Sequence, residues 1–133
     1  GSASRNILNS YFNPEGVPSQ DLSLTNMDIF VGLRKNAAWR DRFCARYVDV
    51  VLNHFAPERL TALLDEYAAA LRPEMARHIR RWGHPSSVSS WERSVKDLRE
   101  LLEQRGSYAL KQLQSNFGLS DAVMATYREA AGH

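Results

Sequence analysis

The chain has 133 residues, a net charge of +2 and an apolar fraction of 44%. This length suits a single domain, and the apolar fraction is sufficient for one core without metal or disulfide cross-links. The small net charge gives no push toward nucleic acid, so no nucleic-acid partner is predicted. No apolar run is long enough to span a membrane, and no signal peptide opens the sequence.

The first 22 residues predict a poorly structured, irregular lead-in. Gly1-Ser2 is typical of a cloning scar, and Asn13-Pro14-Glu15-Gly16 is a turn-forming stretch. From residue 23 to residue 131, apolar residues recur at three- and four-residue spacing with only short breaks. A single helical domain is therefore expected over residues 23–131.

The first two predicted helices differ in how much apolar surface they carry. Thr25 is placed to cap a short helix, and a longer helix is expected over about 37–55. Apolar residues occupy most of the circumference of the longer helix, which should therefore lie centrally in the core.

Prolines bound and interrupt the third predicted helix. Pro57 fits the first turn, where its missing N–H has no intrahelical partner. Pro73 removes a backbone hydrogen bond and predicts a kink or break near Arg72, with helix continuing to Trp82. The expected buried face consists of Leu60, Leu63, Leu64, Tyr67 and Leu71.

Serines and glycines delimit the remaining helices. Ser89 and Glu92 have the spacing of a capping box for a fourth helix. Gly106 is expected to interrupt that helix, and Gly118 to end the one that follows. Ser120 can cap a last helix. With no strand alternation anywhere, the sequence predicts an all-α fold, a compact bundle of five to seven helices.

Residues with catalytic or metal-binding chemistry are sparse. There is no phosphate-binding glycine-rich loop, no cysteine pair and no HExxH motif. The only cysteine, Cys44, lies on the apolar second helix, which favours a buried hydrophobe over a nucleophile. No two of the four histidines are spaced for a shared helix face. No catalytic, cofactor-binding or metal-binding residue is predicted. The histidines are His54, His78, His84 and His133.

The densest positive charge lies near the end of the third helix. One interpretation is an anion-binding surface, and the other is a solvated face whose cations stabilise the helix C-terminus. Acidic residues elsewhere offset the charge and favour the second. The cluster consists of Arg72, Arg77, His78, Arg80, Arg81 and His84. All three tryptophans (Trp39, Trp82 and Trp91) fall in phase with apolar helix faces, which predicts core packing.

Several segments together resemble the C-terminal helical part of the CotH kinase-like family, the spore-coat-type atypical kinases. The first is Leu33-Arg34-Lys35-Asn36 followed by Trp39-Arg40-Asp41-Arg42-Phe43, where Trp39 stands in place of the family's usual Phe. The second is Pro73-Glu74-Met75 followed by His78, Arg81 and Trp82. A third is the tail that contains Trp91, Leu98, Arg105 and Phe117-Gly118-Leu119. The resemblance covers about residues 28–119.

The resemblance implies a helical subdomain without the family's kinase core, which lies upstream of this region. ATP and Mg²⁺ are thereby implied for the parent protein, which resembles an atypical protein kinase, and not for this chain. The implied partner is the kinase-like core of the same parent chain or another protein. The resemblance also suggests a bacterial protein of the spore coat, the cell surface or the secreted fraction.

Two functions are therefore weighed. The first is a structural or docking subdomain of a CotH-like protein, whose docking surface would include Arg77, His78, Arg81 and Trp82. Alternatively, Trp82 packs into its own core and Arg81 points into water. The second function is a free-standing helical interaction module unrelated to kinases, and a basic nucleic-acid binder is a distant third.

Overall fold

The computed structural model describes residues 2–12 and 24–133, and every regular element within these ranges is a helix. This confirms the predicted all-α class. The elements are α1 (Ile7–Phe12), α2 (Leu24–Arg34), α3 (Ala37–Asp49), the π-helix η2 (Val50–His54), α4 (Pro57–Trp82), α5 (Val88–Phe117) and α6 (Asp121–Ala130).

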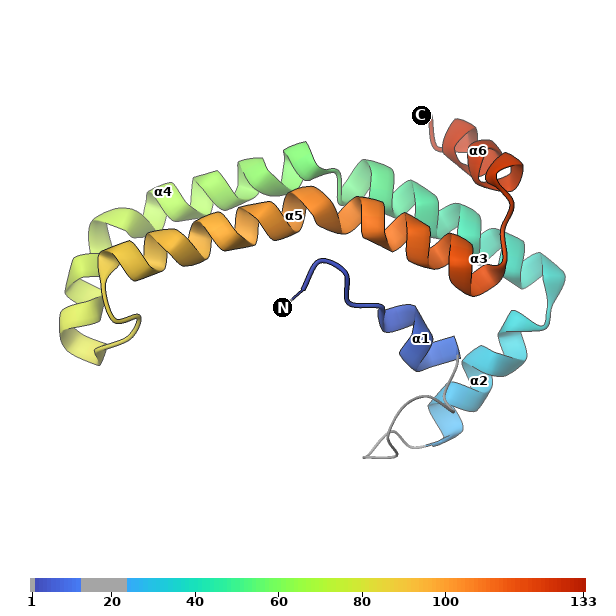
Figure 1. The fold of residues 1–133 in the computed structure, drawn as a ribbon, viewed down its shortest axis with the longest axis horizontal. Helices are drawn as coiled ribbons and strands as arrows, with labels where there is room; N and C mark the ends of the chain where they lie inside the picture. Colours follow the sequence, from blue (N-terminus) through green and yellow to red (C-terminus); the bar gives the residue numbers. More distant parts are fainter. Residues whose placement is uncertain (1, 13–23) are drawn as a thin grey trace.

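The helices form two regions that share α5 (Figure 1). Helix α4 lies beside the first part of α5 in an antiparallel hairpin, which we call the arm (residues 57–104). The second part of α5 is surrounded by α1, α2, α3 and α6, and these elements form the head (residues 2–12, 24–55 and 105–133). The bundle is compact only in the head, because the arm projects away from it.

Helix α3 lies at the centre of the head, as its sequence predicts. Cys44 and Val48 of α3 and Leu113 of α5 are fully buried. The other buried members of this core come from α1, η2, α5 and α6. They are Leu8, Phe12, Val51, Ala109, Leu110, Met124 and Tyr127. Helices as far apart in sequence as α1 (Ile7–Phe12) and α6 (Asp121–Ala130) therefore close over one apolar centre.

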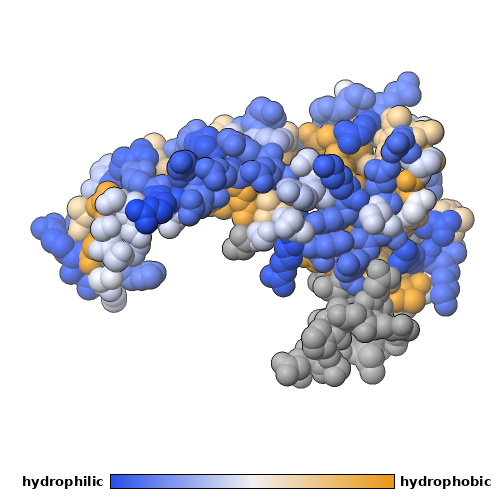
Figure 2. Space-filling model, in the orientation of Figure 1, coloured by the Kyte–Doolittle hydropathy of each residue, from blue (hydrophilic) through white to orange (hydrophobic). Residues whose placement is uncertain are grey.

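The arm buries far less. Its buried apolar residues are Ala68 and Met75 of α4. The predicted buried face is wrong for Leu63, Tyr67 and Leu71, which are exposed at 40, 63 and 54%. In a two-helix hairpin only one side of each helix is covered, and α5 covers the side that carries Ala68. Figure 2 shows hydrophilic residues over most of the arm's visible face.

Proline and glycine set the course of α4. Pro57 occupies the first turn, as predicted, and Gly83 ends the helix in a left-handed conformation with φ of 66°. Pro73 does not break the helix, which runs on to Trp82 and bends in its last turns (Figure 1). The helix is therefore continuous through Pro73 but not straight, and Met75, two residues after the proline, is buried.

Helix α5 differs from its prediction at two points. Its N-cap is Ser87, whose hydroxyl accepts from the backbone N–H of Ser90, and not Ser89. Gly106 does not interrupt the helix, which runs for 30 residues. A Cβ placed at Gly106 would lie 3.7 Å from Val51 Cγ1, an ordinary van der Waals distance, so α5 passes close to η2 at this position.

The predictions at the two ends have different outcomes. The lead-in is wrong for residues 7–12, which form α1, because Leu8 and Phe12 are buried in the head. The turn at 13–16 and residues 17–22 of the lead-in lie outside what the structure describes. Thr25 lies within α2, but its side chain, and with it the predicted cap, is outside the described part of the structure. At the other end, Gly118 stops α5 and Ser120 caps α6, as predicted.

Candidate functional site

The aromatic residues of the family-like segments build the head. Trp39 and Phe43 stack with ring centroids 5.0 Å apart and an interplanar angle of 14°. Phe12 packs edge-on against Phe43 at 5.7 Å and against Phe117 at 5.1 Å. Such pairs add to the free energy gained from apolar burial. The first and third resembling segments therefore meet in space as packing residues.

Arg34 joins the ends of two helices. Its guanidinium donates to the carbonyl of Phe12 at 3.4 Å and also to the carbonyl of Asn116. It lies 5.2 Å from the ring centroid of Phe117. Carbonyls at helix C-termini lack intrahelical partners and carry partial negative charge, so a cation there is stabilising. Arg34 is therefore a structural residue.

Arg105 holds the N-terminal turn against α5. Its Nη1 donates to the carbonyls of Ala3 and Arg5, each at 2.7 Å. Gln112, two turns further along α5, donates to the carbonyl of Ser4 at 2.8 Å. The sequence alone does not predict this role, because every residue has a backbone carbonyl and the acceptors therefore cannot be recognised from residue type.

A partly buried hydrogen bond joins α6 to α3. The hydroxyl of Tyr127 donates to Asp41 Oδ1 at 2.6 Å. Burial and this hydrogen bond raise the pKa of Tyr127 to about 12. Burial, with the charge of Asp41, also raises the pKa of the Cys44 thiol to about 11. Cys44 is fully buried, as predicted, and its raised pKa favours the protonated thiol.

The four residues predicted as a docking surface lie on the last turns of α4. Trp82 is exposed at 65%, so its predicted core packing is wrong; Ile79 is instead the half-buried residue of this turn. The guanidinium of Arg81 lies 5.1 Å from the Trp82 ring centroid, and Arg77 pairs with Glu74 at 3.9 Å. His78 is exposed one turn before Trp82.

Residues 2–12 and 24–133 contain neither a cluster of metal ligands nor a membrane-spanning helix. In these ranges no three His, Cys, Asp or Glu side chains gather closely enough to hold a metal ion. None of the helices in the described ranges combines the length and apolarity of a membrane span. His133 accepts or donates one hydrogen bond, at 3.0 Å to Asn53 Oδ1.

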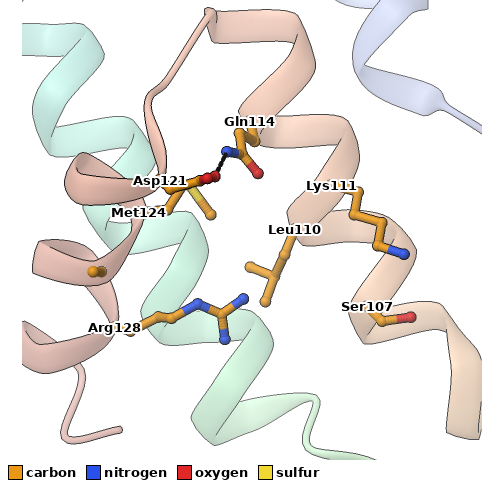
Figure 3. A pocket seen from close by; sticks show the side chains of 8 residues that line it. Ser107, Leu110, Lys111, Gln114, Asp121, Met124 and Arg128 are labelled. Carbon is orange, nitrogen blue, oxygen red and sulfur yellow. Dashed lines mark hydrogen bonds between the residues drawn. The ribbon is translucent and has the colours of Figure 1, made fainter.

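One cavity of about 280 Å³ lies between α5 and α6 (Figure 3). Arg128 extends from α6 toward Leu110, and Gln114 donates to Asp121 Oδ1 at 2.6 Å across one wall. Cations and a carboxylate share this lining, so it has no single charge preference. A neighbouring cavity of about 360 Å³ likewise mixes Glu58 and Glu103 with Arg128.

Two further cavities, which we call the arginine-rimmed groove, adjoin each other along α3 and η2. The first, of about 370 Å³, follows α3, and the second, of about 360 Å³, lies where η2, α4 and α5 meet. Tyr47 and Val50 line both. The lining of the first is completed by Trp39, Arg42, Phe43 and Arg46, and that of the second by Val51, Phe55, Leu60, Leu102, Arg105, Gly106 and Ala109.

Comparison with protein families decides the assignment. Residues 6–109 match the family described as CotH kinase protein. The chain belongs to the CotH kinase protein family. No curated protein and no solved structure shows a significant match.

Membership of the CotH kinase protein family confirms the resemblance that the sequence segments indicate. The matched stretch begins and ends earlier than the resembling segments, which span about 28–119. It takes in α1 and most of the head, together with the whole arm, and stops within α5 at Ala109.

Proposed function

We propose that this chain is a helical docking subdomain of a CotH-family protein and supports a kinase-like core without contributing catalytic residues. The core belongs to the same parent chain or to another protein. ATP and Mg²⁺ binding are assigned to that core. Family membership supports the relation to a kinase-like protein, and the exposed apolar surface of α4 supports the docking role.

The observation that carries the docking role is the exposure of Trp82. Tyr67, Leu71, His78 and Trp82 recur at four- and seven-residue intervals, so they share one side of α4. The three largest apolar members are exposed at 63, 54 and 65%. Tryptophan, tyrosine and arginine are the residue types most enriched among the interface residues that carry most of the binding energy.

Covering of this surface can be measured by hydroxyl-radical footprinting. Oxidation of Trp82 and Tyr67 in this chain is compared with their oxidation in the full polypeptide that the gene encodes and in a complex with a separate kinase-like core. We expect protection of both residues in one of these two. Tyr108, which is exposed at 38% outside this surface, is the control. Unchanged oxidation of Trp82 in both would contradict docking through α4.

The absence of catalysis is tested separately. Calorimetric titration of this chain with ATP and Mg²⁺ should give no heat of binding. Micromolar affinity, or transfer of labelled phosphate to any protein substrate, would contradict the assignment of chemistry to the core.

A further inference from the structure

The arginine-rimmed groove is apolar inside and positively charged at its edge. Its lining contains six aromatic or branched aliphatic side chains on the head side and Leu60 and Leu102 on the arm side. Arg42, Arg46 and Arg105 are its charged residues, and none of its lining residues is acidic. The two cavities near α6 differ in this respect, since both contain carboxylates.

Polar groups in this groove are available to a partner. The Tyr47 hydroxyl, which lines both cavities, makes no hydrogen bond with any residue that the structure describes, although Tyr47 is half-buried. Arg42 forms no ion pair within the described ranges, and Arg46 is paired with Asp49. Arg105 already binds two backbone carbonyls, at 2.7 Å each, which leaves its positive charge unneutralised.

We infer that the arginine-rimmed groove binds an acidic polypeptide segment that carries two large apolar side chains. Each cavity takes one apolar side chain, and carboxylates of the segment pair with Arg42 in one cavity and lie near the unneutralised charge of Arg105 in the other. The Tyr47 hydroxyl, between the two cavities, hydrogen-bonds to the segment. Complementary charge selects an acidic segment over a basic one, and the buried apolar anchors supply most of the affinity.

This inference deepens the proposed docking role and rests on it, but it concerns a different surface. Trp82 and its neighbours lie at the far end of α4, whereas the groove lies where the arm joins the head. One surface can therefore fail its test while the other passes.

Fluorescence anisotropy with a labelled peptide tests the groove directly. The probe is Glu-Glu-Leu-Phe-Glu-Glu-Leu-Phe-Glu-Glu, titrated with the full chain. Two control peptides replace all Glu by Lys, or all Leu and Phe by Ser. We expect saturable binding of the first peptide only, weakening as NaCl is added because exposed charge pairs are screened. Equal binding of the Lys peptide or of the Ser peptide, or no binding of the first, would overturn the inference.

Matched variants locate the binding site. Arg42→Glu should weaken binding about fivefold or more, since it replaces an attraction by a repulsion. Arg80→Glu makes the same change of charge on an exposed residue of the arm and should leave binding within about twofold. Tyr47→Phe preserves the shape of the groove and should weaken binding measurably at unchanged melting temperature. Equal losses in Arg42→Glu and Arg80→Glu would mean non-specific attraction.

A second copy of the chain is the competing occupant. Sedimentation velocity distinguishes it: we expect a monomer over the concentration range of the titration. A dimer that Arg42→Glu dissociates would place another copy in the groove and would overturn the assignment to an acidic segment. The footprint of Trp82 is independent of these results, so failure of the groove leaves the docking role of α4 standing.

Discussion

The head and the arm use similar helices but are stabilised in different ways. In the head, ten buried residues form one cluster, to which α1, α3, η2, α5 and α6 contribute. In the arm, Ala68 and Met75 are buried, and ion pairs between Arg72 and Glu92 and between Arg99 and Asp65 bridge the two helices. Exposed ion pairs contribute little to stability. The difference teaches that the arm depends on its attachment to the head, or on a partner, for order.

The strongest test of this comparison removes an aromatic ring from the head. Phe43→Ala should lower the free energy of unfolding by about 3–5 kcal/mol, because Phe43 contacts Trp39, Phe12 and Phe117. Urea unfolding followed by circular dichroism measures the loss. Leu71→Ala, at an exposed position of the arm, is the control and should change stability by less than about 0.5 kcal/mol. A similar loss in both variants would mean that the two regions do not differ.

A smaller effect is expected from the arm's own core. Met75→Ala should cost about 2 kcal/mol, at the low end of the range for buried Met, because the hairpin can close over the space from one side. Amide hydrogen exchange shows which helices the substitution destabilises. Amides of α4 should exchange faster in the variant while those of α3 keep their protection. Loss of protection in both helices would show that arm and head unfold as one unit.

The joint between α6 and α3 adds a pH-dependent term to the head. Tyr127→Phe removes the hydrogen bond to Asp41 and should cost about 1.5 kcal/mol at pH 7. The folded-state pKa of Tyr127 is raised from 10.0 to about 12. The unfolded chain therefore ionises first, and the stabilisation by Tyr127 is lost as pH rises from about 10 to about 12.

Urea unfolding at pH 8, 10 and 11 checks this term. The difference in stability between the wild type and Tyr127→Phe should shrink at the higher pH values. Cys44 and Tyr47 also lose stabilisation in this range, since burial raises both of their pKa values, but they do so equally in the two proteins. A difference that stays constant up to pH 11 would contradict the raised pKa of Tyr127.

The smallest effect concerns the arm's surface. Arg72→Gln removes the two hydrogen bonds to Glu92, at 2.7 and 3.2 Å, and the contact with the Trp91 ring. We expect a slight fall in melting temperature at low salt and a smaller one in 1 M NaCl. The pKa of Glu92, which Arg72 lowers, should return toward its usual range. A large, salt-independent loss would show that packing of the Arg72 stem on Trp91 dominates.

Sequence periodicity predicted the head better than the arm, for a physical reason. Helix α3 is apolar around most of its circumference, so any packing arrangement buries Cys44 and Val48. Helix α4 carries a wide apolar arc, and the pattern alone does not say which part of it α5 covers. The alanine at position 68, which allows close approach of α5, was the available indication. The larger side chains of Leu63, Tyr67 and Leu71 dominate the apolar pattern of α4, so the pattern places them in the core, although Ala68 is the residue that α5 covers.

Two other features lay beyond sequence reasoning. Gly106 has the identity of a helix breaker, yet α5 runs through it without a break, next to η2, which is far from it in sequence. The arginine-rimmed groove likewise combines residues of α3, η2, α4 and α5. In contrast, the surface at Arg77, His78, Arg81 and Trp82 could be proposed from the sequence, because all four residues lie on consecutive turns of one helix.

Helix α6 lies outside the range that matches the family but contributes to the core of the folded chain. The family match ends at Ala109, whereas Leu113, Met124 and Tyr127, which lie beyond it, are part of the same buried cluster as Cys44 and Val48. The folded unit of this chain is therefore delimited by where its core closes and not by where the family match ends, because side chains of α6 are needed to shield that core from water.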